Sequence, residues 1–407
     1  PDDPNLSLQR GRIHEFFKYT KPHRKLLEQI ELVIIDEISM VRADIIDAID
    51  RILRVYSHNL REPFGGKQLL LVGDVFQLEP VVKNDERDIL NRFYPTPYFF
   101  SARVFGQIDL VSIELQKVYR QTDPVFVSVL DHIRTNTAGA ADLQLLNTRY
   151  GSQIEESEAD MYITLATRRD TVDSINEKKL AELPGNPITF EGVIEGDFPE
   201  SSLPTSQELV LKPGAQIIFI KNDFDRRWVN GTIGVISGID EEEETIYVIT
   251  DDGKECDVKR ESWRNIRYRY NEKTKEIEEE VLGSFTQYPI RLAWAITVHK
   301  SQGLTFSRVV IDFTGGVFAG GQAYVALSRC TSLEGIQLKK PISRADVFVR
   351  PEIVNFAGRF NNRQAIDKAL KQAQADVQYV AAARAFDKGD MEECLEQFFR
   401  AIHSRYD

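Results

Sequence analysis

Short apolar runs that end in polar turns recur along the chain, and stretches with helical periodicity follow them. Four such runs are LVII at 32–35, LLLV at 69–72, YITLAT at 162–167 and VVIDF at 309–313. The stretch after the first run carries apolar residues at the spacing of one helix face: Ile45, Ile49, Ile52, Leu53 and Tyr56. This rhythm predicts an α/β fold. Ligands bind at the carboxyl ends of parallel strands, so we expect chemistry in the polar turns.

The pattern changes between residues 209 and 286. The short apolar segments IIFI, TIGVISGI and TIYVITDD alternate with Asn-Gly, glutamate-rich and Asp-Gly turns. Such spacing predicts a small antiparallel barrel inserted into the second α/β domain.

The chain after Arg359 is helical in pattern and richer in alanine. Its piece AFDKGDMEECLEQFFRAI resembles one tetratricopeptide-type helix pair, with Gly389 in the turn. The residues expected on its inner face are Cys394, Phe398 and Ala401. Because one repeat cannot bury its own face, either the pair packs on the preceding domain or more repeats follow Asp407.

Composition bounds the class of protein. The 407 residues carry a net charge of −12, which argues against a uniformly basic coat but allows a local cationic groove. No apolar run approaches the roughly 20 residues of a membrane span, so we expect no membrane protein. The start of the chain lacks a secretory pattern, and the three cysteines lack paired or metal-type spacing. We therefore expect a cytoplasmic location.

Two stretches could form a cationic groove. The first is Arg10, Arg12, Lys18, Lys21, His23, Arg24 and Lys25, and the second is Lys259, Arg260, Arg264, Arg267 and Arg269 with Trp263, Tyr268 and Tyr270 interleaved. Cations with aromatics suit single-stranded nucleic acid, which makes Trp263 and Arg264 candidate DNA-binding residues. A solvated surface face explains the same pattern equally well.

The segment LVIIDEISM delivers two acids, Asp36 and Glu37, from the end of an apolar strand. A nucleotide hydrolase needs such a pair, since one carboxylate holds magnesium and the next activates the attacking water. Acids also favour helix starts, so the pair alone has a structural explanation. In QLLLVGDVFQLEPV, the strand at 69–72 is expected beside the first, which brings Asp74 and Gln77 to the same edge. The amide of Gln77 can both donate and accept, which suits contact with a terminal phosphate.

Three further segments carry polar side chains of the same class. Arg120 lies in LQKVYRQTDPVF, and Arg329 ends QAYVALSR after Gln322 and Tyr324. Both arginines are candidates for neutralising charge on a transferring phosphoryl group, although a lone arginine is more often a surface ion-pair partner. The segment AWAITVHKSQGLTF offers a compact polar block of Thr297, His299, Lys300, Ser301, Gln302 and Gly303. Such a block can bind phosphates.

Together, IIDEISM, GDVFQLEP, VYRQTD, AITVHKSQG and YVALSR resemble motifs II to VI of superfamily 1B DNA helicases in order and approximate spacing. The sequence is most similar to the bacterial Pif-type enzymes, with RecD-like and phage Dda helicases as more distant relatives. The resemblance implies that Asp36 binds Mg²⁺, Glu37 activates water, Gln77 senses the third phosphate of ATP, and Arg120 and Arg329 approach it. It further implies nucleotide contacts for Asp74, Gln302 and Gly303, and DNA contacts for Thr297, His299 and Lys300. One departure is Glu79, where the family usually has a proline.

The fold implied is α/β, with two RecA-like P-loop NTPase domains of which the first is truncated. Residues 1–140 are expected to be the remainder of the first domain, with a basic wedge-like segment at 1–28. Residues 141–208 and 287–350 would form the second domain, 209–286 an SH3-like barrel, and 351–407 a helical extension. The cofactors would be ATP and Mg²⁺. We expect a monomer that acts on single-stranded and forked DNA in the 5′-to-3′ direction, with a possible protein partner at the helical tail.

The phosphate-binding pattern G-x-x-x-x-G-K-[ST] does not occur in the sequence, and the glycine cluster GGVFAGG at 315–321 lacks the following lysine. We therefore expect a fragment of a longer enzyme. The alternatives are a non-catalytic DNA- or protein-binding module and a RecD-like subunit of a recombination nuclease complex.

Overall fold

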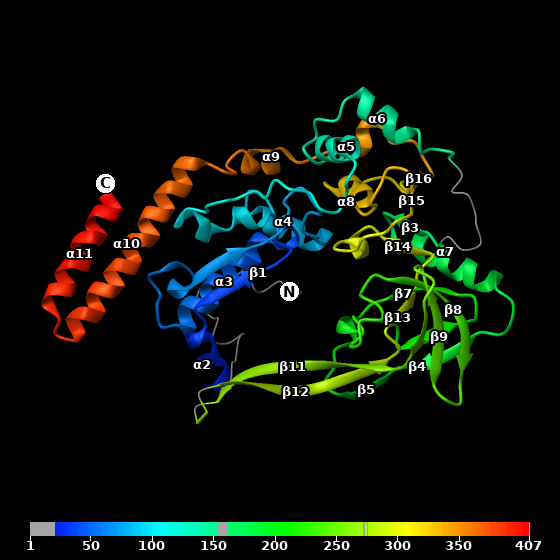
Figure 1. The fold of residues 1–407 in the computed structure, drawn as a ribbon, viewed down its shortest axis with the longest axis horizontal. Helices are drawn as coiled ribbons and strands as arrows, with labels where there is room; N and C mark the ends of the chain where they lie inside the picture. Colours follow the sequence, from blue (N-terminus) through cyan, green and yellow to red (C-terminus); the bar gives the residue numbers. More distant parts are fainter. Residues whose placement is uncertain (1–20, 153–160, 272, 275, 407) are drawn as a thin grey trace. The chain divides into compact units, whose positions relative to one another are not determined.

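The structure is a computed structural model that describes residues 21–152, 161–271, 273, 274 and 276–406. Its contacts divide the chain into two compact units. One unit runs to Ala102 and resumes over Val118–Arg350, and the other joins Arg103–Lys117 to the segment from Pro351. Figure 1 traces the elements of both.

The first sheet of the larger unit contains two parallel strands in register, with Leu32 opposite Gln68. Its elements are β1 (Leu32–Ile35), η2 (Ile38–Met40), α3 (Ala43–Tyr56), η3 (Pro63–Gly66), β2 (Gln68–Leu71), α4 (Asn84–Asn91) and η4 (Phe99–Ser101). The expected neighbouring strands are therefore confirmed. The expected inner face of α3 is wrong in part, because Ile45, Ile49 and Ile52 are only half-buried while Ile46 and Asp50 are buried. Asp50 accepts a hydrogen bond from the Phe64 amide at 2.6 Å, which turns this face toward η3.

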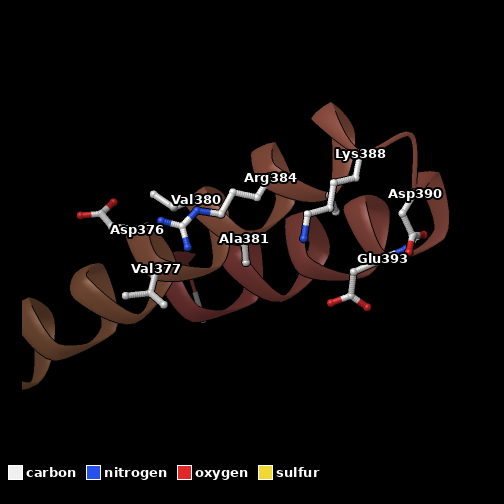
Figure 2. Close-up of a pocket in the computed structure, with 9 residues that line it drawn as sticks. Asp376, Val377, Val380, Ala381, Arg384, Lys388, Asp390 and Glu393 are labelled. Carbon is white, nitrogen blue, oxygen red and sulfur yellow. Dashed lines mark hydrogen bonds between the residues drawn. The ribbon is translucent and has the colours of Figure 1, made fainter.

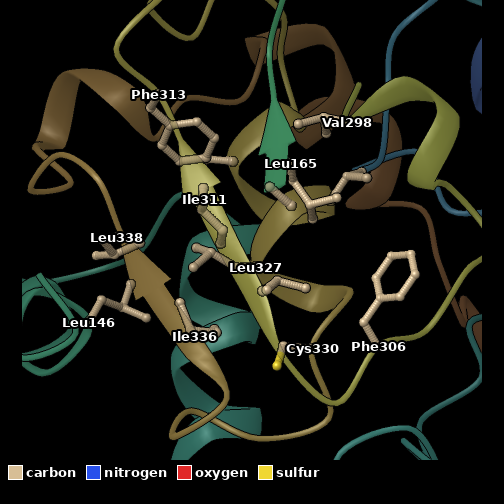
Figure 3. Close-up of a cluster of buried hydrophobic side chains, with 14 of the residues drawn as sticks. Leu146, Leu165, Val298, Phe306, Ile311, Phe313, Leu327, Cys330, Ile336 and Leu338 are labelled. Atoms are coloured by element: carbon tan, nitrogen blue, oxygen red, sulfur yellow. The ribbon is translucent and has the colours of Figure 1, made fainter. Parts of the chain in front are cut away.

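The second sheet is fully parallel, in the order β14-β3-β15-β16. Its strands and helices are α5 (Pro124–Arg134), α6 (Ala140–Asn147), β3 (Ile163–Ala166), α7 (Arg169–Glu182), β14 (Ala295–Thr297), η7 (His299–Ser301), β15 (Val309–Asp312), α8 (Gln322–Ser328), β16 (Ile336–Leu338) and η8 (Arg344–Asp346). Figure 3 shows the buried side chains that fill the space around β15. Helix α5 starts at a proline capped by Asp123, and it adds Phe126, Val129, Leu130 and Ile133 to this core.

A five-stranded antiparallel sheet follows the order β10-β9-β8-β7-β13. Its strands are β7 (Gln216–Phe219), β8 (Ile233–Asp240), β9 (Thr245–Thr250), β10 (Glu255–Val258) and β13 (Ile290–Leu292). They bury a separate core that includes Phe219, which stacks on Trp228 with ring centroids 4.4 Å apart. Short strands β4 (Ile188–Glu191) and β6 (Glu208–Leu211) pair beside it, and η6 (Glu200–Ser202) lies between these two strands in the sequence. The strands expected from IIFI, TIGVISGI and TIYVITDD are confirmed.

A long hairpin of β11 (Glu261–Asn271) and β12 (Glu276–Gln287) extends from this region, and β5 (Val193–Gly196) pairs with its base. Figure 1 shows the hairpin running to α2 (Lys21–Gln29), which contacts β11. Helix α2 is the described end of the expected wedge-like segment, and residues 1–20 lie outside the described part.

The smaller unit contains η5 (Arg103–Gly106), α9 (Pro351–Ala357), α10 (Arg363–Asp387) and α11 (Met391–Tyr406). Helices α10 and α11 form an antiparallel pair with Gly389 in the turn, as expected (Figure 1). Ala401 is buried between them as expected, but Phe398 is 43% exposed, so its expected place on the inner face is met only in part. Small alanines allow the two helices to approach each other closely. The larger Phe398 ring therefore lies at the edge of the helix interface, where it contacts Tyr379. None of the described helices is long and apolar enough to cross a membrane.

Candidate functional site

The turn after β1 presents two carboxylates to solvent. Glu37 adopts a left-handed conformation (φ 49°, ψ 45°), and its backbone amide donates to Asp36 Oδ1 at 2.8 Å. A non-glycine residue in this region is strained, and such strain is concentrated at functional sites. The neighbouring Gly73 lets the chain after β2 pass close by, since a β-carbon there would lie 2.9 Å from the Ile38 amide nitrogen.

The turn after β2 brings Asp74 and Gln77 to the same edge. Asp74 accepts a hydrogen bond from the Phe76 amide at 3.0 Å and is paired with Arg134, whose Nε and Nη2 lie 3.2 Å from its oxygens. The guanidinium of Arg134 also lies over the Phe76 ring, 4.5 Å from its centroid. Arg134 thus connects α5 to this turn. Sequence reasoning missed it, because a basic residue in the last turn of a helix is common.

A direct contact joins the two parallel sheets. Gln302, which follows η7, donates from Nε2 to Glu37 Oε2 at 2.8 Å. Its other amide atom, Oε1, is buried and has no partner among the described residues. The candidate water-activating carboxylate is therefore held by the polar block that follows β14.

Arg329 lies at the end of α8, only 1% exposed. Its guanidinium donates to the carbonyl oxygens of Val325 and Leu304 at 3.0 and 3.2 Å and to Ser328 Oγ at 2.9 Å. Burial and the neighbouring Arg120 lower the pKa of Arg329 to about 10, while Tyr324, Glu37 and Asp74 oppose that shift. At neutral pH it therefore remains a buried cation.

Arg120 approaches the same helix end and donates to the Ser328 carbonyl oxygen at 3.3 Å. Burial lowers its pKa as well. The next residue, Gln121, is buried and donates to the carbonyl oxygens of Ser328 and Cys330 at 3.0 and 2.8 Å. These bonds position the two arginines against each other at one helix end.

Tyr324 is a second residue that the candidate set omitted, although its segment was noted. Burial and the charge of Asp74 raise the pKa of Tyr324 to about 12, and Arg134, Arg329 and Arg120 oppose the shift. Its hydroxyl therefore stays protonated beside one carboxylate and three cations.

Gln77 joins this cluster through its backbone. Gly321, the residue before α8, has φ 77°, and a β-carbon on it would overlap the carbonyl oxygens of Phe76 and Gln77. The start of α8 therefore lies directly against the turn of Gln77. We call Glu37, Asp74, Gln77, Arg120, Arg134, Gln302, Tyr324 and Arg329 the charged cluster.

The remaining polar residues of this block lie at the end of β14 and in η7, within a few residues of Gln302 in the sequence. Thr297 Oγ1 accepts a hydrogen bond from the Lys300 amide at 3.2 Å, and Gly303 has φ 80°. Burial lowers the pKa of His299, and the charge of Glu79 opposes the shift. Glu79 accepts from the Tyr98 hydroxyl at 2.8 Å, which gives the departure from proline a structural role.

Trp263 and Arg264 lie on β11, outside the charged cluster. The Trp263 ring stacks on Phe285 at 5.9 Å, and Lys221 Nζ lies 5.3 Å from its centroid. Arg264 is 3.9 Å from Glu279 on β12, and Arg267 stands opposite Glu280 in the strand register. Two acids of the same hairpin, Glu279 and Glu280, therefore lie close to Arg264 and opposite Arg267.

The donor set near Asp36 suits magnesium. Among the described residues, no three His, Cys, Asp or Glu side chains gather to hold a metal ion by themselves. Magnesium usually takes one or two carboxylates and completes its octahedron with water and phosphate oxygens. One exposed carboxylate beside Glu37 is compatible with that mode.

Comparison with known proteins gives consistent matches. The model of the PIF1-like helicase family matches residues 13–136. The ATP-dependent DNA helicase Pif1 of Campylobacter jejuni is 34% identical over 323 residues, which cover 76% of this chain and 69% of that protein. The human ATP-dependent DNA helicase PIF1 is 35% identical, and the match covers 75% of this chain but 45% of the human protein. The chain therefore spans less than half of the human protein's length.

Solved structures of Pif1 helicases also resemble this chain. Bacteroides Pif1 in complex with ADP-AlF4 superposes with a TM-score of 0.76 at 40% identity, covering 84% of this chain and 77% of that one. Bacteroides Pif1 bound to single-stranded DNA gives a TM-score of 0.63 at 39% identity, covering 86% and 80%. The mixed α/β fold thus matches that of Pif1 helicases, with their RecA-like domains. From the fold, the ordered segments and these relatives together, the chain belongs to the PIF1-like helicase family.

Proposed function

We propose that this chain is the greater part of an ATP-driven helicase that moves 5′-to-3′ along single-stranded DNA and opens forked duplex. The observation that carries the proposal is the charged cluster, in which side chains from two parallel sheets meet. Carboxylates, two amides and arginines on facing elements can bind a triphosphate and stabilise the charge that develops during its hydrolysis. The relatives described as ATP-dependent DNA helicases support this assignment.

In this proposal, Asp36 holds the magnesium ion of ATP, which when bound withdraws charge from the phosphates. Glu37 takes a proton from the attacking water, and Gln302 keeps its carboxylate oriented through the 2.8 Å bond. Gln77 and Asp74 report the state of the third phosphate to the turn after β2. Arg120 and Arg329 neutralise that phosphate. Since Arg329 is almost fully buried, its guanidinium must leave the Leu304 carbonyl to do so.

Residues Thr297, His299 and Lys300 are proposed to contact the DNA strand. Thr297 ends β14, and His299 and Lys300 lie between it and Gln302 in the sequence, so a change at Glu37 can reach them over a few residues. Trp263 and Arg264, which lie on the β11–β12 hairpin outside the charged cluster, are proposed as a second contact with the DNA strand.

We also propose that a longer parent chain supplies the phosphate-binding loop. Parallel sheets are normally covered on both faces, yet Leu32, Ile34, Leu70 and Val72 are 44 to 59% exposed on β1 and at the end of β2. The exposure of this apolar face supports the proposal that a further layer of protein covers it. Without the loop, the 407 residues alone are expected to bind DNA and to hydrolyse ATP negligibly, which is the non-catalytic alternative for this chain.

The DNA contact can be tested with the 407-residue chain and a fluorescein-labelled oligothymidylate. Lys300→Ala should weaken binding and reduce the slope of log affinity against log salt by about 0.7, since one phosphate contact is lost. Lys179→Ala, an exposed lysine on α7, serves as the control. Equal slopes for both variants would remove Lys300 from the DNA path.

A further inference from the structure

A groove of about 660 Å³ runs along α10 to its turn with α11. Figure 2 shows its lining, which comes mainly from one side of α10. The residues are Asp376, Val377, Val380, Ala381, Arg384, Ala385, Lys388, Asp390 and Glu393. None of them belongs to the charged cluster.

The middle of the groove is apolar. Val377 and Val380 are 70% and 51% exposed, and Ala381 and Ala385 continue the same side of the helix. Covering two exposed valines and the alanine surface between them would release ordered water and favour an apolar side chain in this position.

The charges of the groove are unequally engaged. Asp390 accepts from the Glu393 amide at 3.1 Å, and Glu393 accepts from Gln397 at 2.8 Å. Asp376 lies 3.8 Å from Arg405. By contrast, across the described part of the chain, no hydrogen bond or ion pair engages the side chains of Arg384 and Lys388, which are one helical turn apart. Two available cations therefore stand beside the apolar surface.

We propose that this groove binds a short peptide segment in which apolar side chains adjoin carboxylates. The apolar residues cover Val377 and Val380, and the carboxylates pair with Arg384 and Lys388, where a guanidinium fork can bind both oxygens. The acids at both ends of the groove, Asp376 on one side and Asp390 with Glu393 on the other (Figure 2), repel a continuous phosphate backbone. A peptide of limited length avoids them, so peptide is favoured over nucleic acid.

The probe is a fluorescein-labelled peptide with two leucines, two glutamates and a free carboxylate, measured by anisotropy with the complete 407-residue chain. Its matched control has glutamines and an amidated end. Arg384→Glu combined with Lys388→Glu should lower affinity about tenfold or more. Val377→Asp combined with Val380→Asp should do the same. Lys371→Glu, on α10 outside the groove, should leave binding unchanged.

All substituted side chains are exposed, so helix content by circular dichroism should stay constant. Arg384→Lys, which keeps the charge but loses the fork, should retain more affinity than the charge reversal. The proposal is overturned if the glutamine peptide binds equally well, or if the groove variants bind the acidic peptide like the parent. Binding of oligothymidylate that the charge reversal removes would make the occupant nucleic acid. Self-association lost in the valine variant would make it a second copy of this chain.

Discussion

Asp74 holds two groups in place at the end of β2, the Phe76 amide and the guanidinium of Arg134. Both partners of the ion pair are less than one-fifth exposed, so solvent screens it only in part. Because Arg134 ends a helix that packs in the second core, the pair ties that core to the turn that carries Gln77. A movement of the turn after β2 would therefore displace the end of α5, which carries Arg134.

This coupling predicts the outcome of a double-mutant cycle in urea unfolding. Asp74→Ala and Arg134→Ala should each cost about 2 kcal/mol, since each leaves a partly buried charge without its partner. The double variant should lose little more than either single one, with a coupling of roughly 1 to 3 kcal/mol. Additive losses would mean that the pair contributes nothing.

Single residues were predictable from the sequence where a strand end or an ordered segment marked them, as with Asp36, Glu37 and Gln302. Arg134 and Tyr324 were not, since their charged neighbours lie far away in sequence and only the fold brings them together. The sequence also could not show that Arg329 donates to backbone carbonyls of its own domain.

At the level of elements, Gly321 in the glycine cluster at 315–321 serves close packing. Gly321 allows α8 to start directly against the carbonyl oxygens of Phe76 and Gln77. Apolar runs predicted the strands well, because β1 and β15 are short and bounded by polar turns. The orientation of α3 was missed, because it depends on a tertiary bond from Phe64 to Asp50.

Gly321→Ala should therefore destabilise the protein by roughly 2 kcal/mol or more, through both overlap and a positive φ. Gly316 offers a matched control, since it has φ 80° in the same loop but open space around the β-carbon position. Gly316→Ala should cost only about 1 kcal/mol. Thermal unfolding of the two variants compares them, and equal losses would show that contact with the Gln77 turn is unimportant.

On the scale of the larger unit, three contacts connect the two parallel sheets and their helices: Glu37 with Gln302, Asp74 with Arg134, and Gln77 with Gly321. Each contact involves a residue that is proposed to act on ATP: Glu37, Asp74 or Gln77. A cycle of binding and hydrolysis would strain or release all three together, which gives the proposed motor a route from nucleotide to DNA. The ordered segments predicted this arrangement in outline, while the contacts themselves required the fold.

The proposed role of Glu37 is tested most directly by DNA-stimulated ATP hydrolysis in a parent chain that includes a phosphate-binding loop, with Glu37→Gln compared with the exposed control Glu31→Gln. The amide keeps the size of the side chain but cannot accept the proton of water, so kcat should fall about a hundredfold or more while KM for ATP changes little. Glu31→Gln should be unaffected. Hydrolysis by Glu37→Gln at the rate of the parent would contradict the assignment of this cluster as the site of ATP chemistry.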